Sequence, residues 1–154
     1  MDEASHAADP DFDGTELAFW LGEWDVTWDG GRGTNRLTRI LDDRVILEQF
    51  DEIAAPGDTA LVGQSWSVFD VERKRWHQTW VDNQGGYLEL RGDIIDGCFA
   101  FVRAAPERGE NARQRMVFRD VEPDSFRWTW ESSDDDGATW AVRWEIAYLR
   151  RPTG

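Results

Sequence analysis

Hydrophobic and polar positions alternate along most of this chain. In the first run Trp20, Gly22, Trp24, Val26 and Trp28 share one parity, and from Gly22 onward the residues between them are polar. A period of two is typical of a strand that buries one face. Similar runs follow at Thr34–Leu41, Val45–Ile53, Leu61–Phe69, Arg75–Val81, Gly86–Asp93, Cys98–Arg103, Arg113–Phe118, Ser125–Glu131 and Trp140–Leu149. The pattern therefore predicts about ten strands.

Turn residues separate these runs at nearly regular intervals. Gly-Gly-Arg-Gly, Ala-Pro-Gly-Asp and Asn-Gln-Gly-Gly are examples, and only Thr15–Trp20 could form a helix, which Gly22 keeps short. Short strands joined by turns indicate an antiparallel meander, and closure into a barrel removes its exposed edges. We predict an all-β fold, an antiparallel up-and-down β-barrel of about ten strands. A barrel of this size can hold a small ligand in its lumen.

The start of the chain differs in character from the rest. Residues 1–14 are polar and acidic, with Pro10 and Gly14 closing the segment, so we expect a disordered acidic leader there. Residues 15–151 are expected to form a single β-barrel domain, in keeping with a chain of 154 residues.

Charge excludes several classes of partner. The formal net charge is −14, which disfavours nucleic acid and anionic membrane surfaces. The single cysteine, Cys98, cannot form an intramolecular disulfide, and the acidic start is not that of a secretory signal peptide. We expect a cytoplasmic protein. The sequence does not decide its oligomeric state, and a homodimer through an outer face stays open.

Two sets of residues resemble known barrel families. Gly22-x-Trp24 at the start of the meander resembles the first-strand motif of lipocalins and other calycins. That resemblance implies that Trp24 plugs the closed end of the barrel, near Arg150 or Arg151 of the last strand. A wider set looks like the DUF1579-like barrel proteins, an uncharacterised bacterial family, and implies a calycin-like barrel with a polar and aromatic lumen. This set comprises Gly63-x-Ser65, Phe69-Asp70, Trp76-x-Gln78-x-Trp80, Asp82–Gly86, Gly92 and Trp130–Asp134.

The strand around Trp76 is the most informative for chemistry. Trp76, Gln78, Trp80 and Asp82 share one face, and His77 lies on the other. Tryptophan interleaved with polar groups is typical of a ligand pocket, so we expect the first face to point inward. The alternative is a structural polar network inside a filled barrel. The expected ligand-binding residues are Ser65, Trp76, Gln78, Trp80, Arg115 and Trp130.

Two carboxylates are candidates for proton transfer. Glu48 lies between Ile46 and Phe50 on an otherwise apolar face, where burial would raise its pKa unless a cation such as Arg115 pairs with it. Asp82 is the second candidate, since it shares the face of Trp80. A buried Glu–Arg pair without chemistry is the structural alternative.

Metal and cofactor chemistry has little support in the sequence. His6 falls in the leader and His77 is expected to point outward, which leaves no histidine set for zinc or haem. We expect no metal and no cofactor. Ser133-x-Asp135-x-Gly137-x-Thr139-Trp140 fits the Asp-box pattern, a structural hairpin turn.

Two functions follow as hypotheses. The first is binding of a small apolar or aromatic molecule in the lumen. The alternative is a cofactor-independent cyclase or isomerase acting on a biosynthetic intermediate in the same cavity, with Glu48 or Asp82 as the acid or base. A filled barrel with a structural or interaction role is the third option, and the sequence leaves open whether the protein is an enzyme.

Overall fold

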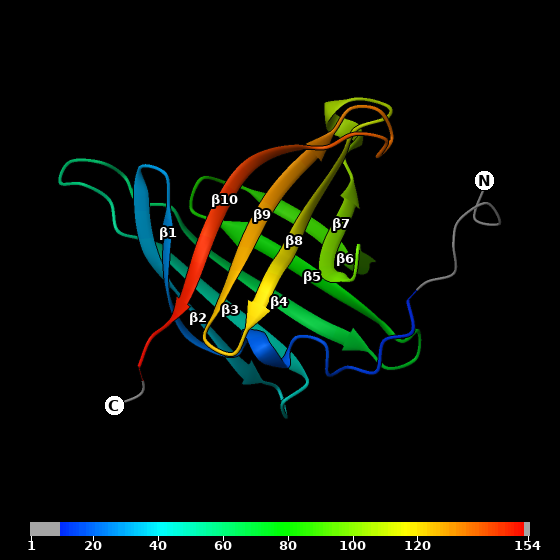
Figure 1. The fold of residues 1–154 in the computed structure, drawn as a ribbon, viewed down its shortest axis with the longest axis horizontal. Helices are drawn as coiled ribbons and strands as arrows, with labels where there is room; N and C mark the ends of the chain where they lie inside the picture. Colours follow the sequence, from blue (N-terminus) through cyan, green and yellow to red (C-terminus); the bar gives the residue numbers. More distant parts are fainter. Residues whose placement is uncertain (1–9, 153–154) are drawn as a thin grey trace.

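Ten antiparallel strands close into a barrel in the computed structural model, which describes residues 10–152 (Figure 1). Each strand pairs with its sequence neighbours, and β1 pairs with β10 to close the ring. The strands are β1 (Gly22–Trp28), β2 (Gly31–Ile40), β3 (Val45–Glu52), β4 (Val62–Asp70), β5 (Arg75–Asp82), β6 (Tyr87–Ile95), β7 (Cys98–Ala104), β8 (Arg113–Glu122), β9 (Ser125–Ser133) and β10 (Ala141–Arg150). The predicted fold class is confirmed.

Within residues 10–152, helical structure is limited to two short 3-10 turns, η2 (Ala18–Trp20) and η3 (Pro106–Arg108). None of the helices in the described part of the chain has the length and hydropathy to cross a membrane.

Alternation along each strand separates a lumen face from an outer face. On β5, Trp76 and Gln78 are buried, Trp80 is half-buried and His77 between them is exposed. Trp80 and Asp82 line a cavity inside the barrel, so the Trp76 face points inward as predicted. The same alternation puts Glu48 on β3 and Ser65 on β4 inside the barrel, where both are buried and adjacent in register.

One end of the barrel is closed by the segment that precedes β1. Leu17 and Trp20 are fully buried there, and the Trp24 indole Nε1 donates to the Trp20 carbonyl oxygen at 2.9 Å. The Arg150 guanidinium lies over the Trp24 ring at 4.2 Å from its centroid and donates to the carbonyl oxygens of Leu21 and Phe19. The expected pairing of Trp24 with an arginine of the last strand is therefore confirmed for Arg150.

The end of the expected leader lies against this closed end. Phe12 is buried, and its ring lies 5.5 Å from that of Phe99. Glu16 accepts a hydrogen bond from Trp76 Nε1 at 2.9 Å, which ties the same segment to β5. The leader was expected over residues 1–14, but its end is packed on the barrel because Phe12 has apolar surface to bury. Residues 1–9, with His6, lie outside the described residues.

The turn between β9 and β10 has the hydrogen bonds of the Asp-box pattern. Ser133 Oγ accepts from the Gly137 amide at 2.9 Å, and Asp135 Oδ1 accepts from the Thr139 amide at 2.9 Å. Gly137 has φ +87°, a conformation that glycine adopts without strain. The Trp140 indole packs across the turn and donates to the Gly137 carbonyl oxygen at 3.1 Å. This segment is a structural turn, as predicted.

Candidate functional site

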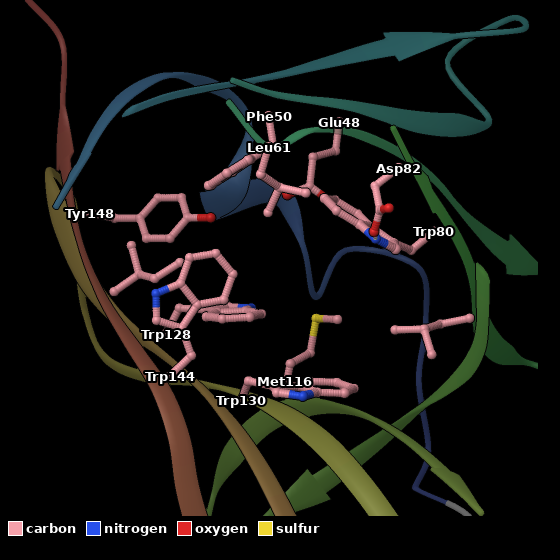
Figure 2. Close-up of a pocket in the computed structure, with 12 residues that line it drawn as sticks. Glu48, Phe50, Leu61, Trp80, Asp82, Met116, Trp128, Trp130, Trp144 and Tyr148 are labelled. Carbon is pink, nitrogen blue, oxygen red and sulfur yellow. Dashed lines mark hydrogen bonds between the residues drawn. The ribbon is translucent and has the colours of Figure 1, made fainter. Parts of the chain in front are cut away.

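A cavity of about 190 Å³ lies inside the barrel, at the end away from the closing segment (Figure 2). Its half-exposed lining residues Leu61, Asp82 and Leu88 flank the β3–β4 and β5–β6 connections, so the cavity opens at that end. Its volume is of the order of a dry cavity that binds benzene, about 150 Å³. The lining residues are Glu48, Phe50, Leu61, Trp80, Asp82, Leu88, Met116, Trp128, Trp130, Trp144, Ile146 and Tyr148.

Aromatic rings form most of the cavity wall. The rings of Trp128 and Trp144 meet edge to face with centroids 5.7 Å apart, and Phe50 meets Trp80 and Trp144 in the same manner at 6.4 and 6.0 Å. Such edge-to-face contacts fix ring orientation in addition to burying apolar surface. The rings therefore give the cavity a defined shape even without an occupant.

A hydrogen-bonded chain of polar side chains runs along one side of the cavity. The Asn35 amide Nδ2 donates to Glu48 Oε2 at 2.7 Å and to the Tyr148 hydroxyl oxygen at 2.8 Å. Ser65 Oγ donates to Glu48 Oε1 at 2.6 Å. All four residues are buried. Asn35 and Ser65 lie behind the wall, so the polar atoms that this chain presents to the cavity belong to Glu48 and Tyr148.

Tyr148 is held so that its hydroxyl reaches the cavity. Its ring stacks on Phe126 with centroids 4.2 Å apart and an angle of 18° between the ring planes. Figure 2 shows the hydroxyl pointing toward the space between the rings. Because the oxygen accepts from Asn35, its proton is available for donation, and no acceptor for it is present among the described residues.

Burial controls the ionisation of both groups. Burial raises the pKa of Glu48 above its usual range, and the hydrogen bonds from Ser65 and Asn35 oppose this shift only in part. Burial, and then the nearby Glu48 carboxylate, raise the pKa of Tyr148 well above its usual value. The Tyr148 hydroxyl therefore keeps its proton at neutral pH and can donate a hydrogen bond, and Glu48 holds its proton to a higher pH than an exposed glutamate does.

Asp82 has a different environment at the mouth of the cavity. Its carboxylate accepts from Trp80 Nε1 at 2.9 Å and from the amides of Gln84 and Gly86. Partial burial raises its pKa, but these three hydrogen bonds together bring the pKa below its usual range. Asp82 is thus a stable carboxylate that orients Trp80, and Glu48 is the better acid or base of the two predicted candidates.

Not all of the predicted ligand-binding residues line the cavity. Trp80 and Trp130 do, whereas Ser65 contacts it only through Glu48. Gln78 is inside the barrel but donates to Ser67 Oγ at 3.0 Å, away from the cavity wall. Trp76 also points inward, but it lies in the packed closed end against Phe69, Phe99 and Glu16.

Arg115 is on the outside of the barrel, and its expected pairing with Glu48 is wrong. Arg115 Nε donates to Glu131 Oε1 at 2.7 Å, and its guanidinium lies 3.9 Å from the centroid of the Trp140 ring. Arg115 does share a face with Val117, as expected, but that face points outward, because Gln114 and Met116 with Phe118 take the lumen positions of β8. Val117 is buried there beneath neighbouring outer side chains, so its apolar character misled the assignment.

Several residues of the site were missed from the sequence. Trp144, Ile146 and Tyr148 alternate with polar or small residues on β10, and this period of two was a usable signal for a lumen face. Asn35 had a weaker signal, its shared parity with Leu37 on β2. Nothing in the sequence indicated that Asn35 would bridge Glu48 and Tyr148, which lie 13 and 113 residues away.

Metal binding has no support in the described residues. Nowhere in residues 10–152 do three or more His, Cys, Asp or Glu side chains come together as a metal site would require.

The fold is similar to that of a solved structure of different sequence. This chain aligns with the S-type phycobiliprotein lyase CPES from Guillardia theta with a TM-score of 0.58 and 10% sequence identity, covering 92% of this chain and 95% of that one. The TM-score shows that the two proteins share a fold, and at 10% sequence identity the likeness extends no further than the fold. No protein-family model and no curated protein matches this sequence.

Proposed function

We propose that this barrel binds a small, ring-containing apolar molecule in the cavity bounded by Trp80, Trp128, Trp130 and Trp144. The observation that carries the proposal is the combination of an open aromatic cavity of about 190 Å³ with two buried polar groups, Glu48 and Tyr148, at its wall. Ligand sites are typically concave and apolar with a few convergent polar groups. A purely structural barrel would be expected to fill this space with side chains.

Two further considerations support a binding role. The structurally similar barrel is named a lyase of phycobiliproteins, so this strand arrangement occurs in a protein with a biochemical activity. The resemblance of the sequence to calycins and to DUF1579-like proteins, which we retain as part of the proposal, also implies a lumen that takes a ligand. We also propose a cytoplasmic location and a single barrel domain over residues 15–151, and a homodimer through an outer face stays open.

Tryptophan fluorescence tests the proposal directly. We expect some members of a panel of one-ring and two-ring compounds to change the emission of the protein and to raise its Tm. A ligand at 100 times its Kd stabilises a protein by about 2.7 kcal/mol. Trp128→Phe should reduce the emission change because Trp128 lines the cavity, whereas Trp66→Phe should not, since Trp66 lies on the outer face of β4. A panel that leaves both emission and Tm unchanged would refute the proposal.

One observation favours an enzyme as the second candidate. Glu48 has a raised pKa and faces the same cavity as the Tyr148 hydroxyl, an arrangement that suits proton transfer in a cyclase or isomerase. If the protein is such an enzyme, a bound compound should be converted on incubation, and Glu48→Gln should abolish conversion while binding persists. Recovery of every bound compound unchanged would count against catalysis.

A further inference from the structure

We propose that the natural occupant of the cavity is an organic cation, an ammonium group attached to an apolar ring or chain. This inference rests on the proposed binding function and names the chemical class of its ligand. It follows from the charges that line the cavity, from the type of ring in its wall and from the partners of Glu48.

All of the charge that lines the cavity is negative. Glu48 and Asp82 are the ionisable acids among the lining residues, and these residues include no Lys, Arg or His. The side chains that bind the Glu48 carboxylate, Asn35 and Ser65, are neutral. A buried carboxylate with neutral partners is costly unless an opposite charge approaches it, so a cationic ligand would supply the counter-charge that the protein itself does not.

The wall is built from the rings that bind cations best. Trp80, Trp128, Trp130 and Trp144 line the cavity with Phe50 and Tyr148, and tryptophan is the strongest cation–π partner among the side chains. Two other cations of this protein already use such contacts, Arg150 over Trp24 and Arg115 over Trp140. An ammonium group between these rings would be attracted by their faces and by the Glu48 carboxylate together.

Ligands of other charge fit this wall less well. An anion would face the carboxylates of Glu48 and Asp82, with only neutral donors such as the Tyr148 hydroxyl to attract it. A neutral ring could fill the volume but would gain no attraction from the Glu48 carboxylate. The net charge of −14 also attracts cations to the surface and repels anions, which favours the same choice at the stage of encounter.

Ionisation of Glu48 couples this choice to pH. Besides Glu48, the titratable groups that line the cavity are Asp82 on β5 and Tyr148 on β10. The lining residues of β8 and β9 are Met116, Trp128 and Trp130, which carry no charge. The partners of Glu48 behind the wall, Asn35 on β2 and Ser65 on β4, are also uncharged. Burial raises the pKa of Glu48, so in the empty cavity its neutral form persists to a higher pH than that of an exposed glutamate. A bound cation favours the carboxylate, and its affinity should therefore rise with pH until Glu48 is ionised in the empty protein.

Matched ligands of different charge test the inference. Calorimetric titrations would compare phenethylammonium, 2-phenylethanol and phenylacetate, each also as its 2-naphthyl analogue. We expect the cation to bind about ten-fold more tightly than the alcohol, and phenylacetate to bind more weakly than both. Glu48→Gln should remove most of that preference and leave the alcohol unaffected. Glu145→Gln, an equal loss of charge on the outer face of β10, should leave the preference intact.

The outcomes separate the two proposals. If the alcohols bind as tightly as the ammonium compounds, the charge inference is wrong and the binding function stands. If no compound binds, both are wrong. Because Glu48→Gln could disturb folding, a second measurement uses the wild-type protein and the permanent cation benzyltrimethylammonium. Its affinity should rise with pH over the range from pH 4 to pH 9, and an affinity that stays constant over this range overturns the role of Glu48.

Discussion

Asn35 joins the two polar groups of the cavity, and its amide nitrogen is used twice, by Glu48 and by Tyr148. We predict that Asn35→Ala lowers the free energy of unfolding by about 1–3 kcal/mol, because both partners stay buried after losing a donor. Urea unfolding measures this change. Thr38→Ala, an exposed position on the same strand, is the control and should change stability by no more than about 0.5 kcal/mol. An equally small effect for Asn35→Ala would mean that water replaces the lost donor.

Glu48 should make the folded protein less stable as pH rises, whereas an acid in a salt bridge makes it more stable as pH rises. Its pKa in the folded protein is raised above the usual value of 4.5, so the folded state holds the proton more tightly than the unfolded state. Wild-type stability should therefore fall, relative to Glu48→Gln, as pH rises from about 4.5 through the raised pKa, and the difference should then level off. Thermal unfolding of both proteins from pH 4 to pH 9 checks this. If Tm changes with pH in the same way for both proteins, the pKa of Glu48 is not raised by burial in the folded state.

At the scale of elements, the β9–β10 turn depends on a carboxylate. Hydrogen bonds from the Thr139 hydroxyl and amide, and from Ser133, lower the pKa of Asp135 to about 2. This stabilisation is present above the unfolded pKa near 3.8 and is lost as pH falls toward 2. We predict that Asp135→Asn speeds amide hydrogen exchange at Gly137 and Thr139. Asp134→Asn, next in sequence and exposed, should leave both rates unchanged, and equal rates in the two variants would contradict the assignment.

Sequence patterns located all ten strands, because each strand contrasts a buried face with an exposed one. Their ends shift by a residue or a few: β8 continues to Glu122 beyond the predicted Phe118, and β2 begins at Gly31 rather than Thr34. Turn residues marked the connections but did not fix where backbone pairing stops. Local sequence therefore predicts which segments form strands, but it does not predict the residues at which those strands begin and end.

The site was predictable only in part, because it depends on contacts between distant strands. Trp80, Asp82 and Glu48 were found, since each shares a face with clearly apolar neighbours. Arg115 was misplaced because both faces of β8 carry a buried apolar residue, Val117 outside and Met116 inside. Its true partner, Glu131, is opposite it in the β8–β9 register. Parity orders residues along one strand, whereas partners are set by register between strands.

For the whole molecule, closure of the ring joins the two ends of the chain. Trp24 on β1 pairs with Arg150 on β10, so the last ladder brings together residues separated by most of the sequence. All-β proteins, whose strand pairing is largely non-local, fold slowly, and the closing ladder adds the most distant contacts here. We predict refolding in milliseconds to seconds, with a single unfolding transition seen equally by fluorescence and circular dichroism. Stopped-flow refolding and equilibrium urea titrations test this. Refolding within microseconds, or transitions that do not coincide, would show that part of the barrel folds without closure.

The packed segment ahead of β1 closes one end of the barrel, and the cavity opens at the β3–β4 and β5–β6 end. A resident molecule and its replacement cannot pass each other in a space of about 190 Å³. Exchange must therefore be dissociative, so the rate at which a bound molecule departs should be the same whatever the concentration of its competitor. The residence time of the ligand would then be set by the ligand itself and by the loops beside the opening of the cavity.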